Sequence, residues 1–304
     1  ALISVIMTFA NMIDMLTVNP CIKTAMKASP HTFDSLLSDK LTTDMLPNFI
    51  YGSYTGLAVT VFGLVPTITA MFGKSILPSL AESCAKNDKK AMQSGLTKML
   101  IVTSIIAIPA GMGIAVLSEP ILRFLFGGRE TEIQVCIMPM SILGIAVIFL
   151  AIATPCFAIL QTLGKPHKAI IIMSAGGIIK LFLNIILIRQ PIINISGAAI
   201  STLVSEVFIC VLSVRSVCKM TDLKPKVSEI FVKPTYAAIT CSVTAILSHE
   251  TLTKIAHLQI NHRFVTLFSI GIGSTMYFFC LYLLCETPKN IVNYIFSKKN
   301  PQNP

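Results

Sequence analysis

The chain has 304 residues, of which 54% are hydrophobic and only 12% are charged, and its formal net charge at pH 7 is +10. A soluble domain carries about twice that charged fraction, roughly 25%, because it needs a polar surface to cover its core. The composition therefore excludes an ordinary water-soluble protein and indicates a chain dissolved in lipid.

Long apolar runs recur from one end of the sequence to the other, and each is close to the roughly 20 residues that span a bilayer as a helix. The runs are continuous rather than alternating, which favours helices over barrel strands. The sequence predicts an all-α integral membrane protein with eight transmembrane helices, at 1–18, 54–80, 96–118, 134–160, 168–188, 196–217, 233–249 and 264–285. The chain begins ALISVIMTF, without a Met or a charged leader, so we interpret it as a fragment that starts inside the first of these helices.

The connections between these helices alternate in positive charge. Fourteen Lys and Arg residues flank one set of helix ends, which includes the C-terminal tail, and eight lie in the intervening connections. The positive-inside rule predicts that the side with fourteen, and with it the C-terminus, faces the cytoplasm. The net charge is then a topology signal and an attraction to anionic lipid, rather than a sign of a nucleic-acid partner.

The residue types that carry enzymatic or metal chemistry are dispersed. Nine cysteines are scattered through the apolar runs without a Cys-x-x-Cys or metal-ligand spacing, and the five histidines are equally spread. No Gly-rich phosphate-binding loop or ATPase motif is present. We therefore predict no catalytic residue, no metal and no cofactor, and we expect transport energy to come from an H⁺ or Na⁺ gradient or from the membrane potential.

Four ionisable residues lie inside the predicted helices: Asp14, Lys74, Lys180 and Glu206. Each costs roughly 2.5–3.5 kcal/mol on insertion scales, so such residues usually face a polar cavity or a partner. Lys74 lies near a cytoplasmic helix end and is interpreted as snorkelling to the interface. Lys180 and Glu206 each lie roughly 14–15 Å below the outer surface, at 1.5 Å per residue. Two interpretations stay open: an intramembrane ion pair between Lys180 and Glu206, or a Lys180 that faces a water-filled cavity and meets an anionic substrate.

Amides extend this polar pattern. Asn184 lies four residues after Lys180 and shares its helix face, and Asn11 lies three residues before Asp14. Asp14 is either a helix-terminal carboxylate near the headgroups or part of a cavity wall. We predict that Asn11, Asp14, Lys180 and Asn184 line a substrate cavity.

Several segments resemble a known family of transporters. They are YGSYTGLAVTVFGLVPTITAMFGKSILPSLAES (51–83), PAGMGIAVLSEPILRFLFG (109–127), AILQTLGKPHKAIIIMSAGGIIKLFLNIILI (158–188) and INISGAAIST (193–202). They resemble the C-terminal part of the polysaccharide-export and lipid-flippase branch of the multidrug/oligosaccharidyl-lipid/polysaccharide (MOP) superfamily. Within it, the sequence is most similar to the stage V sporulation protein B group, relatives of the lipid II flippase MurJ. The resemblance extends over nearly all of residues 1–285.

The resemblance implies an architecture and a mechanism. Family members have fourteen helices, in two six-helix lobes that face each other in a V, followed by a final helix pair. By this pattern residues 1–219 are the second lobe, residues 220–304 are the final pair with a basic cytoplasmic tail, and the first lobe is the missing partner. Lys180 and Asn184 match a Lys and an Asn of the family's eleventh helix, and Asn11 and Asp14 match polar positions of its seventh.

Three functions stay open at this point. The first is a flippase of the bacterial plasma membrane, a transporter rather than an enzyme, that moves a polyprenyl-pyrophosphate-linked oligosaccharide or a cell-wall (peptidoglycan) precursor by alternating access. The second is a cation-coupled multidrug antiporter of the MATE type, for which Asp14 and Glu206 are the intramembrane carboxylates. The third is a partial chain without activity of its own, because half of a V encloses no cavity.

Overall fold

A computed structural model describes residues 2–29, 42–86, 88–222, 228–256 and 262–284. In lipid, a helix satisfies its backbone hydrogen bonds internally, so apolar runs of this length fold as helices. The elements in chain order are α1 (Leu2–Ala28), α2 (Leu46–Ser53), the π-helix η2 (Tyr54–Val59), α3 (Thr60–Phe62), α4 (Leu64–Ala85), α5 (Lys89–Val116), α6 (Ser118–Phe126), α7 (Glu130–Thr162), α8 (Pro166–Leu187), α9 (Ser196–Thr221), the π-helix η3 (Ser228–Val232), α10 (Lys233–Ala256) and α11 (His262–Leu284).

Seven stretches of the described residues are helical, long enough and apolar enough to cross a membrane: 46–71, 89–116, 130–162, 166–187, 196–221, 230–254 and 264–283. They correspond to the last seven of the eight predicted spans. The first predicted span lies in α1, which is a 27-residue helix but is not one of these seven. The predicted boundary between lobe and final pair, at 219 and 220, lies two residues before α9 ends.

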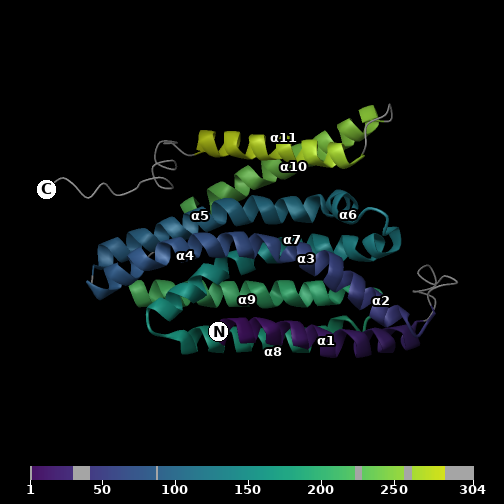
Figure 1. Ribbon diagram of the computed structural model, residues 1–304, viewed down its shortest axis with the longest axis horizontal. Coiled ribbons are helices and arrows are strands. Elements are labelled where there is room, and N and C mark those ends of the chain that lie inside the picture. Colours follow the sequence, from purple (N-terminus) through teal and green to yellow (C-terminus); the bar gives the residue numbers. More distant parts are fainter. Residues whose placement is uncertain (1, 30–41, 87, 223–227, 257–261, 285–304) are drawn as a thin grey trace.

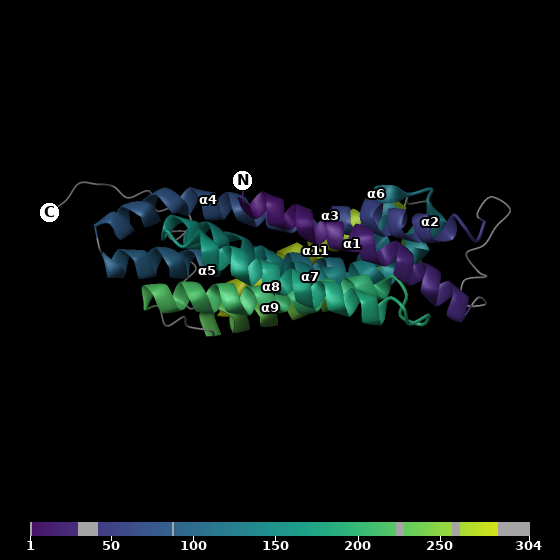
Figure 2. The ribbon, with the colours of Figure 1, turned by 90° about the horizontal axis from the view of Figure 1, so that it is seen from below.

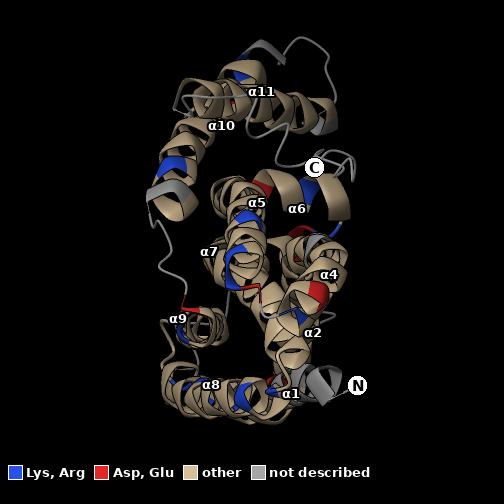
Figure 3. Ribbon diagram, turned by 90° about the vertical axis from the view of Figure 1, so that its left-hand side faces the viewer, with Lys and Arg blue, Asp and Glu red and all other residues tan. Residues whose placement is uncertain are grey.

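The helices run side by side along the long axis of the molecule (Figure 1). Viewed end-on, α10 and α11 form one side, α4 to α7 form the middle, and α8 and α1 form the opposite side beyond α9 (Figure 3). The 33-residue α7 is the central helix, because it packs against α4, α5 and α9. α1 packs along α8, as the view from below also shows (Figure 2).

The motif ILQTLGKP forms the reversal between α7 and α8. Gly164 has a φ of +70°, a left-handed conformation that favours glycine. The N–H of Lys165 donates to the carbonyl of Leu160 at 2.9 Å, which closes the end of α7. Pro166 is then the first residue of α8, a position where the missing proline N–H is not needed.

The basic helix ends lie together at one end of the bundle, where α4, α7, α9 and α11 end and α5, α8 and α10 begin (Figure 1). Lys89 Nζ binds Asp222 Oδ2 at 3.2 Å, and Gln93 Nε2 donates to the carbonyl oxygens of Thr221 and Asp222 at 3.1 Å. These contacts join the start of α5 to the end of α9. The residues before 96 extend α5 itself, because Asp88 accepts a hydrogen bond from the N–H of Ala91 and caps the helix.

Candidate functional site: a buried polar network between α1, α8 and α9

The buried face of α8 carries two polar residues among apolar and small ones. Its buried positions follow the helical repeat: Ala169, Ile172, Met173, Gly176, Lys180 and Asn184. From residue 175 to the end of α8 the exposed positions are large and apolar, namely Ile178, Phe182 and Ile186, and Ile171 is exposed one turn earlier. The ammonium and the amide therefore point into the protein while hydrocarbon side chains face outward.

Lys180 forms a buried ion pair with Asp14 of α1. Its Nζ lies 2.7 Å from Asp14 Oδ2, and the two side chains are only 9% and 10% exposed. Asn184 Nδ2 donates to the other carboxylate oxygen, Oδ1, at 2.9 Å and also lies 3.0 Å from Thr17 Oγ1. Both oxygens of Asp14 thus have donors, which is the condition under which a buried carboxylate is tolerated.

α9 completes the network with two serines. Ser201 Oγ donates to Asn184 Oδ1, and Ser205 Oγ donates to the carbonyl oxygen of Gly176 at 2.9 Å. Gly176 has no side chain, and a Cβ there would overlap Ile209 of α9. The small residue lets α8 and α9 approach closely enough for these hydrogen bonds. Asn184 of α8 therefore hydrogen-bonds to Asp14 of α1 and to Ser201 of α9, so its amide connects all three helices.

The structure does not form the predicted ion pair between Lys180 and Glu206. No nitrogen–oxygen distance of 4.0 Å or less joins them in the part of the chain that is described, and the partner of Lys180 is Asp14 instead. The reason is the helical register of α9. Ser201 and Ser205 point at α8, and Glu206 is one residue further, which rotates it by about 100° around the helix. One carboxyl oxygen of Glu206, Oε2, is buried and accepts no hydrogen bond from the described residues.

Asp14 lies in the middle of its helix. α1 continues to Ala28, ten residues beyond the predicted end of the first span, and Asp14 is 7% exposed. The interpretation of Asp14 as a helix-terminal carboxylate is therefore wrong. The structure brings together three of the four residues predicted to line a cavity: Asp14, Lys180 and Asn184. They lie between packed helices in this structure. That they line a substrate cavity stays a prediction. The side chains of Asn11 and Lys74 lie outside the described part.

Sequence reasoning missed Thr17, Ser201 and Ser205. Each had a signal in its spacing, because Thr17 lies three residues after Asp14, and Ser201 and Ser205 lie four residues apart on one face of α9. Among the residues that the structure describes, no three His, Cys, Asp or Glu side chains gather closely enough to hold a metal ion.

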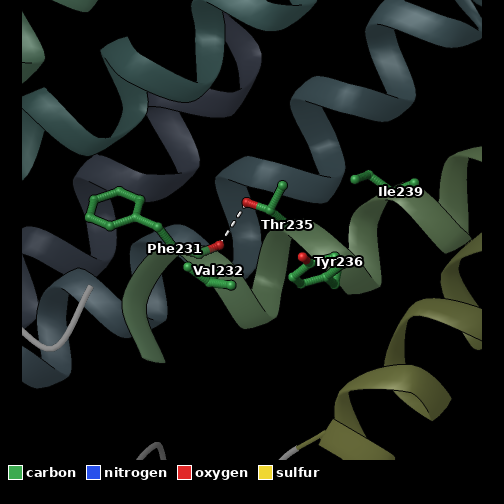
Figure 4. Close-up of a pocket in the computed structure, with 5 residues that line it drawn as sticks. All are labelled: Phe231, Val232, Thr235, Tyr236 and Ile239. Atoms are coloured by element: carbon green, nitrogen blue, oxygen red, sulfur yellow. Dashed lines mark hydrogen bonds between the residues drawn. The ribbon is translucent and has the colours of Figure 1, made fainter. Parts of the chain in front are cut away.

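A shallow groove lies on the opposite side of the molecule, at the start of α10 (Figure 4). Five residues line it: Phe231, Val232, Thr235, Tyr236 and Ile239. The hydroxyl of Thr235 donates to the carbonyl oxygen of Phe231 at 2.6 Å, so it is already used within the helix. The lining carries no charged side chain and is separate from the network.

A bundle of membrane-length helices defines a multi-pass membrane protein. Its buried ion pair marks a candidate functional site, because ionisable residues inside a membrane are rare and usually functional. Residues 49–272 match the family model described as lipid II flippase MurJ. The chain belongs to this family.

Three curated relatives are named as flippases or as a sporulation protein. The chain is 26% identical over 136 residues to the lipid II flippase MurJ of Bacillus subtilis, covering 45% of this chain and 25% of that protein. It is 26% identical over 186 residues to the probable low-salt glycan biosynthesis flippase Agl15 of Haloferax volcanii, covering 60% and 38%. It is 22% identical over 182 residues to stage V sporulation protein B of Bacillus subtilis, covering 59% and 34%. The chain thus spans between 25% and 38% of the length of these three relatives.

Solved structures with a similar fold come from the MOP superfamily. An outward-facing multidrug-resistance MATE transporter has a TM-score of 0.52 at 16% identity and covers 88% of this chain and 64% of that chain. A MOP superfamily transporter from Pyrococcus furiosus, described as having a binding pocket of reverse polarity, has a TM-score of 0.51 at 14% identity and covers 88% of this chain and 64% of that chain. These similarities show a shared fold and confirm the predicted fold class.

Proposed function

We propose that this chain is the second lobe and the final helix pair of a flippase that moves a polyprenyl-pyrophosphate-linked oligosaccharide or cell-wall precursor across a bacterial plasma membrane. The observation that carries the proposal is the match of residues 49–272 to the lipid II flippase family, together with relatives that are named flippases. The partner that completes the cavity is a first lobe, and transport proceeds by alternating access of the two lobes, driven by an H⁺ or Na⁺ gradient or by the membrane potential.

The polar network suits a lobe that moves as one body. The helices α1 and α8 are joined by the contacts of Asp14 with Lys180 and Asn184. The hydrogen bond from Ser201 to Asn184 joins α9 to α8. Buried hydrogen bonds and ion pairs are directional, so this network resists sliding of one helix along another. In this role the network sets the position of a cavity wall, and Lys180 is not available to a pyrophosphate while it is paired with Asp14.

The orientation of the chain follows from the charge at the two ends of the bundle. One end of the bundle carries Lys89, Lys165 and Lys219, and the connections at this end contain more Lys and Arg residues than those at the other end. The positive-inside rule supports a cytoplasmic location for that end, and for the C-terminus with it. A reporter that fluoresces only in the cytoplasm, fused to the C-terminus, tests this orientation. Fluorescence is expected, and activity of a periplasm-specific reporter instead contradicts it.

The MATE-like fold keeps a cation-coupled drug antiporter as the second candidate. Such an antiporter needs intramembrane carboxylates that are free to exchange a cation. Asp14 is occupied by Lys180 and Asn184, so among the described residues the candidate depends on Glu206. The match of residues 49–272 to the lipid II flippase family favours the flippase.

A cell-based experiment distinguishes the two functions. The intact natural protein that carries this chain is expressed in a bacterial strain depleted of its own lipid-linked precursor flippase. We expect growth and cell-wall synthesis to be restored, without proton-driven efflux of a cationic dye. Dye efflux without rescue supports the antiporter and overturns the proposal. Lys165→Met, an exposed lysine at the start of α8, is the control that should keep full activity.

A further inference from the structure

Three ionisable residues lie on three neighbouring helices: Asp14 on α1, Lys180 on α8 and Glu206 on α9. They comprise two carboxyl groups and one ammonium. Lys180 and Asp14 are 2.7 Å apart and neutralise each other. An ionised Glu206 would add a negative charge that no cation at ion-pair distance compensates in the described part of the chain.

Glu206 is half-buried, and one of its carboxyl oxygens, Oε2, is buried and accepts no hydrogen bond from the described residues. The positive charge that attracts an ionised Glu206 is Lys180 of the neighbouring helix α8. On α9 and the helices packed against it, the other titratable groups that the structure describes are Cys210, Arg215, Cys218 and Lys219 of α9, Glu130, Glu132, Cys136 and Cys156 of α7, Lys165, His167 and Lys168 of α8, and Lys89, Lys90 and Lys98 of α5. Most of the charged ones lie near the ends of their helices, a long way from the middle of α9.

An uncompensated charge at this depth costs several kcal/mol, on the order of 2.5–3.5 on insertion scales, whereas a protonated carboxyl group carries no charge. We propose that Glu206 is a proton-binding site, and that Asp14 and Glu206 are alternative counter-ions of Lys180. In the arrangement seen here Lys180 is paired with Asp14, and Glu206 holds the proton.

Release of that proton changes the network. The O–H bond of the Glu206 carboxyl group breaks, the proton passes to water, and the electron pair stays on the carboxylate, while Lys180 keeps its three protons. The ammonium is then attracted by two carboxylates on different helices, and its hold on Asp14 weakens. Because the Lys180–Asp14 pair fastens α1 to α8, proton release loosens α1. This coupling does not depend on which cargo the protein carries.

Infrared spectroscopy of the protein in lipid tests the proposal directly, because a protonated carboxyl group absorbs in a region separate from that of carboxylates. At neutral pH we expect a band from one buried carboxylic acid in the wild type, and we expect Glu206→Gln to remove it. A wild type without the band at neutral pH, or a band that persists in Glu206→Gln, overturns the proposal.

Two further variants test the alternative counter-ions. Asp14→Asn leaves Glu206 as the counter-ion of Lys180, so the band is expected to disappear although Glu206 is intact. Lys180→Met removes the cation, so both acids should hold protons and the band should about double. A band unchanged in Asp14→Asn contradicts the exchange of counter-ions. Helical content and monodispersity are checked for every variant, and if Asp14→Asn does not fold, Lys180→Met and Glu206→Gln decide.

Discussion

Replacing Lys180 by Met should destabilise the lobe far more than a single side chain of α8 otherwise would. The change removes the 2.7 Å ion pair and leaves Asp14, 7% exposed, with Asn184 as its remaining side-chain donor. Removal of one partner from a buried ion pair costs about 3–5 kcal/mol, whereas interhelical hydrogen bonds in membranes average about 0.6 kcal/mol. Asp14 limits the loss by taking up a proton, so we expect a decrease of about 2–4 kcal/mol in the free energy of unfolding.

The assay is equilibrium unfolding in mixed micelles, followed by helical circular dichroism. Lys165→Met is the matched control, because it removes an exposed lysine from the start of the same helix and should change stability by less than about 0.5 kcal/mol. The double variant Lys180→Met/Asp14→Asn removes both charges, so it should lie closer to the wild type than Lys180→Met does.

Two outcomes would refute this reasoning. If Lys180→Met and Lys165→Met are equally stable, the buried pair does not fasten α1 to α8. If the effects of Lys180→Met and Asp14→Asn simply add in the double variant, the two residues do not interact, because non-interacting sites are additive within about 0.3–0.5 kcal/mol.

Three smaller changes test the packing and the helix ends. Gly144→Ala should lower the free energy of unfolding by about 1–3 kcal/mol, because the new Cβ would lie 2.5 Å from the backbone nitrogen of Ala115, where α7 crosses α5. Gly113→Ala is the control, because a Cβ there meets nothing within 4 Å. This control should be neutral or stabilising in the same unfolding assay. Gly164→Ala should cost about 1–2 kcal/mol because its φ is +70°, and an unchanged unfolding midpoint would contradict the turn geometry. Asp88→Ala should lower the free energy of unfolding by about 1 kcal/mol. It should also speed hydrogen exchange in the first turn of α5, because the variant lacks the Asp88 cap. Unchanged exchange there would show that the cap contributes nothing.

The sequence predicted the helices well because a continuous apolar run has one way to satisfy its backbone in lipid. Helix ends were less predictable. α5 begins at Lys89 rather than 96, because a capped polar segment extends the helix beyond the apolar run. The π-helix at Tyr54–Val59 was not expected either. The sequence there has one glycine, Gly56, between the β-branched residues Thr55 and Val59, and this pattern also fits an ordinary kinked helix.

Asp14, Lys180 and Asn184 of the network were predicted as site residues, but the partner of Lys180 was not. Depth along a helix is predicted by residue counting, and this counting assigned Lys180 and Glu206 to a similar level. The choice between partners depends on which helices pack together and on their rotation, and neither quantity follows from depth. α1 lies far from α8 in sequence, and its packing along α8 is a property of the folded lobe.

Direct measurement of lipid translocation tests the central claim most sharply. The intact protein is reconstituted into vesicles that contain a polyprenyl-pyrophosphate-linked sugar with a fluorescent label on the sugar, and an impermeant reductant is added outside. The account predicts that label from the inner leaflet becomes accessible faster than in protein-free vesicles, and more slowly with Lys180→Met than with Lys165→Met. The account is contradicted if the label becomes accessible no faster than in protein-free vesicles. This result counts when the vesicles are shown to hold folded protein and each driving gradient has been applied.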